Sequence, residues 1–126
     1  MALSISAHHM SFPVRDLERS RAFYEGVLGL EPIPRPDMGP VRGVWYRAGP
    51  CEVHLIEVPE GAPVGEPPPV LNPMGRHAAF AVADYEEAKA ALLAHDLEIL
   101  ESPRGGQIWT RDPDGHVIEL IVTATP

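Results

Sequence analysis

Residues 9–16 read HMSFPVRD and residues 77–84 read HAAFAVAD, so His, Phe, Val and Asp recur in place after a shift of 68 positions. Two further stretches repeat at nearly the same distance. VHLI (53–56) matches IELI (118–121), and WYR (45–47) matches WTR (109–111). A small drift in the shift is what short loop insertions produce. The sequence therefore predicts a duplicated fold, in which equivalent positions meet around a two-fold axis.

The composition is that of an ordinary globular chain, and it excludes some classes of function. The 126 residues suffice for one domain with a real core. With 18 acidic and 10 basic residues, the net charge of −8 argues against nucleic-acid binding, which needs clustered cations. No apolar run approaches the roughly 20 residues of a membrane span, and no signal peptide is evident. The single cysteine, Cys51, forms no internal disulfide. We expect a soluble, cytoplasmic protein.

Each half of the chain is predicted to run strand, helix, then three strands. Strands of the first half are expected at about 8–14, 30–34, 42–48 and 51–58, with a helix capped by Asp16 and ended by Gly29. Strands of the second half are expected at about 76–82, 97–101, 106–111 and 115–122, with a helix capped by Asp84. Six of the 15 prolines fall within 59–75, which we interpret as the connection. Module 1 then covers about 6–58 and module 2 about 76–122.

Alternation along the strands places polar side chains on the face away from the helices. Residues at i and i+2 share a face, so one titratable residue should lie near the middle of each of four inner strands. If the strands curl together, these residues form the floor of a cleft. Three imidazoles and a carboxylate are the composition of a divalent metal site. The predicted ligands are His9, His54, His77 and Glu119.

Two motifs carry a resemblance to a known family. The run HxSxxVxDLxxSxxFYxxxLG (9–29) and the run DPDGHxxEL (112–120) resemble the opening and closing signatures of the glyoxalase / bleomycin-resistance / extradiol-dioxygenase group, the vicinal oxygen chelate superfamily. The resemblance covers nearly the whole chain. It implies a single α+β domain (1–126) of two tandem βαβββ modules, which form a cupped, mostly antiparallel mixed sheet around a divalent metal. Small members commonly dimerise, so that modules of two chains complete each site.

The same resemblance assigns His9, His77 and Glu119 to the ligand positions. His54 falls where glyoxalases carry a Glu. Four protein ligands on an octahedral cation leave two adjacent positions for a bidentate oxygen substrate, so we predict a glyoxalase-like lyase or isomerase acting on a small oxygenated substrate. The metal would be Ni, Zn, Co or Mn, and Glu119 and His54 are the candidate catalytic groups.

Three alternatives use the same residues differently. A two-His-one-carboxylate set suits an Fe(II) ring-cleaving dioxygenase, with His54 as an outer acid or base. Thiol transfer to an epoxide antibiotic is a further enzymatic option. A non-catalytic resistance module would sequester a compound and bind no metal tightly. Whether the modules pair within one chain or across a homodimer stays open, although the resemblance favours the dimer.

Other polar and aromatic residues are weighed as substrate contacts or as structural. His8 and His116 are predicted to point away from the ligands, and His95 to interact with a helix C-terminus. Asp112 and Asp114 are interpreted as turn formers. The two tryptophans are predicted either to frame the mouth of the cavity or to pack. The candidate substrate contacts are Ser11, Trp45, Arg47, Trp109 and Arg111.

Overall fold

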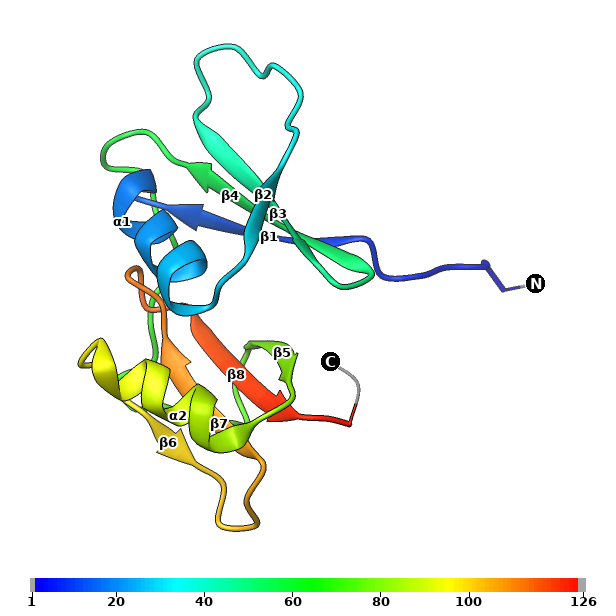
Figure 1. Ribbon diagram of the computed structural model, residues 1–126. Coiled ribbons are helices and arrows are strands. Elements are labelled where there is room, and N and C mark those ends of the chain that lie inside the picture. The colour runs from blue at the N-terminus through cyan, green and yellow to red at the C-terminus, as the bar shows by residue number, and fades with distance from the viewer. Residues whose placement is uncertain (1, 125–126) are drawn as a thin grey trace.

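The computed structural model describes residues 2–124 and contains two modules of the same plan (Figure 1). The elements of module 1 are β1 (His9–Val14), α1 (Leu17–Arg21), η1 (Ala22–Val27), β2 (Glu31–Ile33), β3 (Gly43–Ala48) and β4 (Cys51–Glu57). Those of module 2 are β5 (Ala78–Val82), α2 (Tyr85–Ala94), β6 (Leu100–Glu101), β7 (Gln107–Arg111) and β8 (Val117–Val122).

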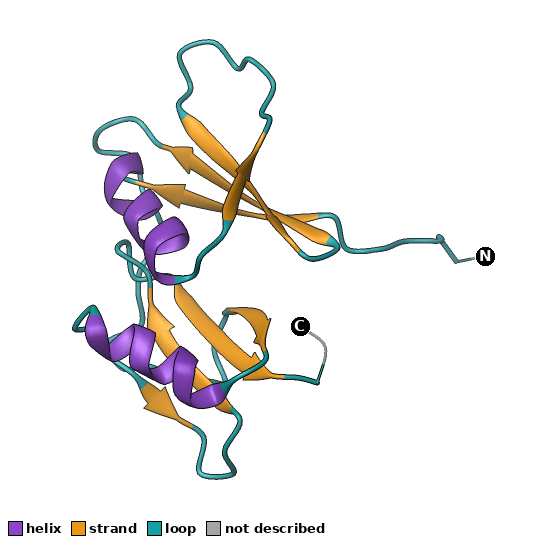
Figure 2. Ribbon diagram, in the orientation of Figure 1, coloured by secondary structure: helices purple, strands orange, loops and turns teal. Residues whose placement is uncertain are grey.

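Both modules have the same strand order. The sheets run β1-β4-β3-β2 and β5-β8-β7-β6, with β1 parallel to β4, β5 parallel to β8, and the remaining neighbours antiparallel. Figure 2 shows the helices of both modules on the same side of the molecule. The predicted α+β class and the two βαβββ modules are confirmed. Hydrogen bonding divides the strands between two open four-stranded sheets.

The helices begin where the sequence predicts. The Asp16 carboxylate accepts a hydrogen bond from the Arg19 amide at 3.2 Å, and the Asp84 carboxylate accepts one from the Glu87 amide at 2.9 Å. The first helix differs from expectation in its second half, where Ala22–Val27 is a π-helix. The wider turn leaves both Phe23 and Tyr24 buried. An apolar stripe alone does not distinguish these two helix types.

One apolar core spans both modules. It combines Tyr24, Tyr46 and Leu55 of module 1 with Leu92 and Ile118 of module 2, all fully buried. Most side chains of this core lie on the helix-facing sides of the sheets, and His54 and Glu119 lie on the opposite faces. No helix within residues 2–124 is long and apolar enough to cross a membrane.

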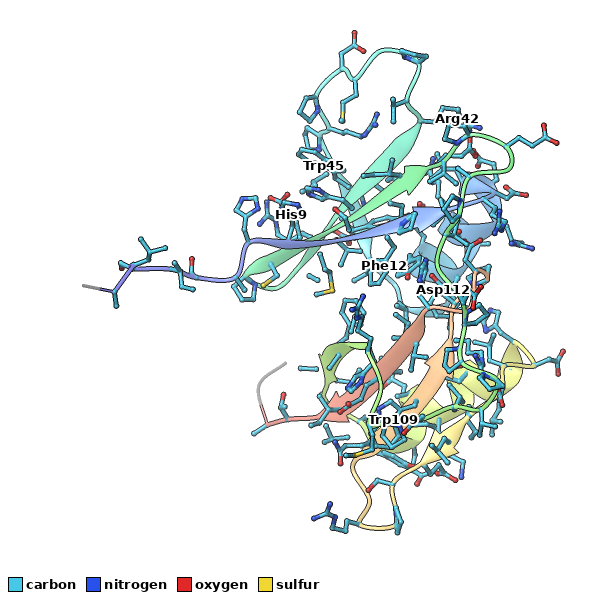
Figure 3. The ribbon with its side chains drawn as sticks, turned by 180° about the vertical axis from the view of Figure 1, so that it is seen from behind. His9, Phe12, Arg42, Trp45, Trp109 and Asp112 are labelled. Atoms are coloured by element: carbon cyan, nitrogen blue, oxygen red, sulfur yellow. The ribbon has the colours of Figure 1, made fainter. Side chains whose placement is uncertain are left out.

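A turn of module 2 fastens the two modules together. Tyr24 donates to the buried Asp112 carboxylate at 2.8 Å, and Ser20 donates to Asp114 at 3.4 Å. His116 Nε2 lies 2.8 Å from the carbonyl oxygen of Pro13. Figure 3 places Phe12 and Asp112 in this seam between the modules. Asp112 and Asp114, interpreted from sequence as turn formers, therefore also join the modules.

Candidate metal centre

Strand register puts the predicted ligands on the inner faces, away from the helices. His54 is opposite Trp45 and Ser11, and Glu119 is opposite Trp109 and Ala79. We expected all four ligands near the middle of strands. That holds for His54 and Glu119, whereas His9 is the first residue of β1 and His77 directly precedes β5. The side chains of His9 and His77 nevertheless reach His54 and Glu119, respectively.

Module 2 brings His77 and Glu119 into direct contact. The Nε2 atom of His77 is 2.9 Å from Oε1 of Glu119, whose side chain is only 7% exposed. Nδ1 of His77 is 2.9 Å from the Gly75 carbonyl, to which it can only donate. The Gln107 amide donates to the second carboxylate oxygen at 3.0 Å. Both side chains are therefore held in place by a second hydrogen bond.

This pair of donor atoms fits a divalent cation. With Nδ1 donating to Gly75, Nε2 of His77 can donate a hydrogen bond to the Glu119 carboxylate, and its lone pair can instead bind a cation that this carboxylate also binds. Two ligand atoms bound at about 2.1 Å to one octahedral cation lie about 3.0 Å apart. The 2.9 Å between Nε2 and Oε1 matches that separation. Module 2 thus presents two donor atoms at a spacing that is compatible with a shared metal ion.

Module 1 brings His9 and His54 together in a different manner. Their rings stack with centroids 4.1 Å apart, and the indole of Trp45 stacks on the other face of His54 at 3.8 Å. Figure 3 labels His9 and Trp45, the outer rings of this stack, on module 1. The stack fixes the ring plane of the buried His54. It also leaves the exposed His9 beside it.

Hydrogen bonding separates the two imidazoles of module 1. His54 Nε2 lies 3.0 Å from Glu52 Oε1, and this hydrogen bond holds the pKa of Glu52 below its ordinary value. His9 Nδ1 lies 2.8 Å from Nδ1 of His8, so its Nε2 is free to bind a metal. His54 must use its other nitrogen or release Glu52 to join the same cation. His9 is therefore the better placed ligand of the pair.

One chain thus forms two pairs of candidate ligands, the predicted half-sites, on the inner faces of different modules. Among residues 2–124, no group of three or more His, Cys, Asp or Glu side chains could hold a metal ion. The four-residue set stays a prediction, because a second copy would be needed to bring the pairs together.

The residues predicted to contact substrate differ in their ion pairs and in their exposure. Arg111 donates to Glu98 at 2.8 Å and is occupied by that ion pair. Arg47 lies opposite Glu52 and is exposed, with no ion pair among the described residues. Ser11 and His77 both line a cavity of about 920 Å³ between β1, the turn 114–117 and the chain before β5. Ser11 therefore lies where a substrate could reach it.

Sequence reasoning missed two residues that support the ligands. Gln107 is two residues from Trp109 on β7, so strand alternation could have placed it on the inner face. Gly75 acts through its carbonyl oxygen, which no side-chain pattern reveals. Of the other histidines, Nδ1 of His95 is 2.9 Å from the Ala91 carbonyl oxygen and His116 lies in the seam. His8 was expected to point away from the predicted ligands, but its ring is in contact with that of His9.

Two repeated modules with donor side chains on their inner faces define a class of duplicated α+β proteins. This chain belongs to the glyoxalase/bleomycin resistance protein/dioxygenase superfamily, whose family model matches residues 6–120. Members of the superfamily generally depend on a divalent metal.

Two relatives by sequence carry enzyme names. The chain is 28% identical over 121 residues to glyoxylase I 4 of Arabidopsis thaliana, covering 91% of this chain and 69% of that protein. It is 29% identical over 109 residues to the mitochondrial methylmalonyl-CoA epimerase of Bos taurus, covering 73% of this chain and 59% of that protein.

Solved structures of similar fold cover almost the whole chain. A glyoxalase family protein from Bacillus anthracis is 26% identical with a TM-score of 0.75, covering 98% of this chain and 99% of its own. The fosfomycin resistance protein FosX from Mesorhizobium loti is 25% identical with a TM-score of 0.69, covering 96% and 92%. These neighbours fit a metal-dependent lyase or isomerase and leave the specific reaction open.

Proposed function

We propose that this protein is a divalent-metal-dependent, glyoxalase-like lyase or isomerase acting on a small oxygenated substrate. The observation that carries the proposal is the contact between His77 Nε2 and Glu119 Oε1 at 2.9 Å. It leaves two donor atoms side by side at a separation that one cation can bridge. The likeness to proteins named as a glyoxylase and an epimerase supports the same class of chemistry.

The complete site in this proposal belongs to a homodimer. His9 and His54 of one copy would face His77 and Glu119 of the other around one cation. Support comes from the geometry of the single chain, whose inner faces carry two pairs of donors and no cluster of three within residues 2–124. The duplicated scaffold makes the two pairs equivalent in position, so a two-fold axis can unite them.

The chain's own side chains would orient the substrate and move its protons. A bound divalent cation supplies a Lewis acid that polarises a carbonyl oxygen. An isomerase or lyase also needs a group that takes a proton and returns it at a neighbouring atom. We assign that role to Glu119 and His54, because Gln107 fixes the carboxylate while Trp45 and Glu52 fix the imidazole. Ser11 and the exposed Arg47 would contact the substrate.

Metal analysis combined with turnover tests this function. The purified protein should hold about one Ni, Zn, Co or Mn per chain and convert the hemithioacetal of methylglyoxal and a thiol. His77→Ala and Glu119→Ala should lose the metal, whereas His95→Ala, which alters an exposed histidine at the end of α2, should keep it. Iron together with cleavage of a catechol would instead assign a dioxygenase. No bound metal in the unaltered protein would contradict the enzyme and favour a binding module.

The likeness to a fosfomycin resistance protein favours one second candidate, which is transfer of a thiol to an epoxide antibiotic. The same ligand set would serve it. Consumption of fosfomycin by the metal-loaded protein, with no turnover of the hemithioacetal, would select this candidate over the first.

A further inference from the structure

The linker between β4 and β5 (residues 58–77) does more than connect the modules. It contains no helix or strand, as its prolines predict, yet Val64 and Leu71 are buried, with 4% and 6% of their surface exposed. Leu71 packs with Trp109 and Val117 in an apolar cluster separate from the main core, and Leu100 lies at its border. Part of the linker is therefore bound to module 2.

That cluster lies on the same face of the sheet as the half-site. Trp109 is directly opposite Glu119 in the β7–β8 ladder, so the two side chains project from the same face. Val117 precedes Glu119 by two residues and shares this face. Leu71 thus covers the inner face of module 2 on the β7 side of the Glu119 carboxylate. Figure 3 shows the linker passing close to Trp109.

Contacts on both sides of Leu71 hold the linker in place. Pro67 packs so closely on Gly115 that a Cβ at position 115 would collide with its ring. Beyond Leu71, Asn72 closes a turn with the amides of Met74 and Gly75. Gly75 then accepts the hydrogen bond from His77 Nδ1. The linker segment that carries Leu71 is therefore connected by a hydrogen bond to His77, one of the predicted metal ligands.

The equivalent tryptophan of module 1 has no such cover. Trp45 is half-buried and stacks on His54, whereas Trp109 is 6% exposed beneath Leu71. The Trp109 indole N–H is buried and has no hydrogen-bond partner within residues 2–124. An unpaired buried donor costs free energy unless an acceptor reaches it. The face of module 2 beside Glu119 thus has an apolar wall with one unused donor.

We propose that Leu71 and Trp109 form a wall that limits the size of the substrate, so that the site takes substrates with a short side group. The inference rests on the proposed metal site and adds the size of the side group that this site accepts. A substrate oxygen near Glu119 would direct its side group either toward the open inner face of module 1 or against Leu71. Shortening Leu71 would open a space over the indole that a larger group can fill.

Two α-hydroxy acids that differ only in a side group test the wall. Lactate carries a methyl group and mandelate a phenyl group, and both offer two oxygens to a metal. Their dissociation constants would be measured by calorimetry on metal-loaded protein, for the unaltered chain and for Leu71→Ala. We expect Leu71→Ala to shift the ratio of the two constants toward mandelate by about tenfold or more. Val70→Ala, which alters the exposed neighbouring side chain, should leave the ratio unchanged.

A second measurement needs neither metal nor turnover. In metal-free protein with Trp45→Phe, fluorescence reports Trp109 alone, and acrylamide should quench it more strongly after Leu71→Ala than after Val70→Ala. Leu71→Val serves as a milder change in case the alanine variant does not fold, and should move both readouts in the same direction by less.

The outcomes separate this proposal from the function on which it rests. Selective binding that depends on Leu71 without turnover of the hemithioacetal would sustain the wall and reject the lyase. Three results would contradict the proposed wall. They are an unchanged ratio of the two constants, equal quenching in the Leu71→Ala and Val70→Ala variants, and binding of neither acid by metal-loaded protein.

Discussion

The two modules share one plan of strands but use their inner faces in opposite ways. In module 1 the middle of the last strand carries an imidazole, stacked between His9 and the half-buried Trp45. In module 2 the same position carries Glu119, in contact with His77 and beside a tryptophan covered by the linker. Duplication has thus kept the positions of the side chains. Substitutions and one linker contact have left the inner face of module 1 open, whereas the inner face of module 2 holds His77 and Glu119 in contact and is partly covered by the linker.

The charged side chains of the two modules also differ in how they are paired. Arg111 of module 2 is bound to Glu98, whereas its counterpart Arg47 is exposed and makes no ion pair among the described residues. Glu119 has its hydrogen-bond partners within module 2, and Glu52 of module 1 is bound to His54. Module 2 is therefore the half that we expect to dominate metal affinity, and module 1 the half that we expect to receive substrate.

The largest expected effect separates the carboxylates of the two modules. Glu119→Ala removes an anionic ligand atom and should weaken metal binding by more than about 100-fold, or about 2.8 kcal/mol. Glu52→Ala removes only the partner of His54 and should weaken metal binding by about tenfold. Competition with a chelator of known affinity measures both. Equal losses in the two variants would contradict the division of roles.

The contact of the linker with module 2 gives the next largest effect. Gly115 has φ +88° and faces Pro67, so Gly115→Ala both strains the backbone and displaces the linker. We expect a loss of about 2 to 3 kcal/mol in the free energy of unfolding. Gly105→Ala is the matched control, because its φ of +79° is similar and nothing lies within 4 Å of the new Cβ. It should cost only the strain, about 1 kcal/mol. Urea denaturation measures both free energies of unfolding. Equal losses for Gly115→Ala and Gly105→Ala would mean that the contact with Pro67 contributes nothing to stability.

The hydrogen bond between Tyr24 and Asp112 in the seam predicts that Tyr24→Phe lowers the free energy of unfolding by an amount that depends on pH. Burial raises the pKa of Asp112, so its ionised form is the costly one, and the hydrogen bond from Tyr24 offsets part of that cost. A group whose pKa is higher in the folded than in the unfolded state favours folding at a pH below its unfolded-state pKa. This contribution is lost as the pH rises through the folded-state pKa. Tyr24→Phe raises this pKa further and should cost about 2 kcal/mol at about pH 7.

Near about pH 3.5 the same substitution should cost less, because Asp112 is then largely protonated in both the folded and the unfolded states. Urea denaturation of Tyr24→Phe and of the unaltered chain at the two pH values measures the difference. An equal loss at both would mean that Asp112 is not the group through which Tyr24 acts.

The smallest effect concerns the two arginines. Arg111→Ala breaks a partly exposed ion pair and should reduce stability by about 0.5 kcal/mol, decreasing in high salt. Arg47→Ala removes no ion pair and should leave stability unchanged within about 0.5 kcal/mol. It should instead raise the KM for an anionic substrate. Reversal of the two stability values would show that the pairing in solution differs from that described.

Repetition in the sequence was enough to predict the modules, and alternation was enough to place the inner faces. HMSFPVRD and HAAFAVAD locate both first strands and both helix caps, since Asp16 and Asp84 each accept the expected hydrogen bond. His54 and Glu119 lie on the face that strand alternation assigned to them. These features depend on local spacing, which a sequence contains directly.

What escaped prediction depends on contacts between distant segments. Leu71 lies in a proline-rich stretch without periodicity, so its burial against Trp109 could not be read from its neighbours. The role of Gly75 depends on a backbone carbonyl, and that of Asp112 on Tyr24 of the other module. The division of the four predicted ligands into two pairs follows from how the modules pack, which no repeat specifies.

The most direct test of the account asks whether the half-sites of two copies share one cation. Chains carrying His9→Ala and chains carrying Glu119→Ala, each inactive alone, would be co-expressed with different tags, and the mixed dimer isolated. In a shared site, one of the two sites in the mixed dimer retains all four donors. We therefore expect about half of the unaltered metal content and activity to return. If the mixed dimer binds no more metal than its inactive parents, the two pairs do not meet across copies, and the proposed centre is wrong.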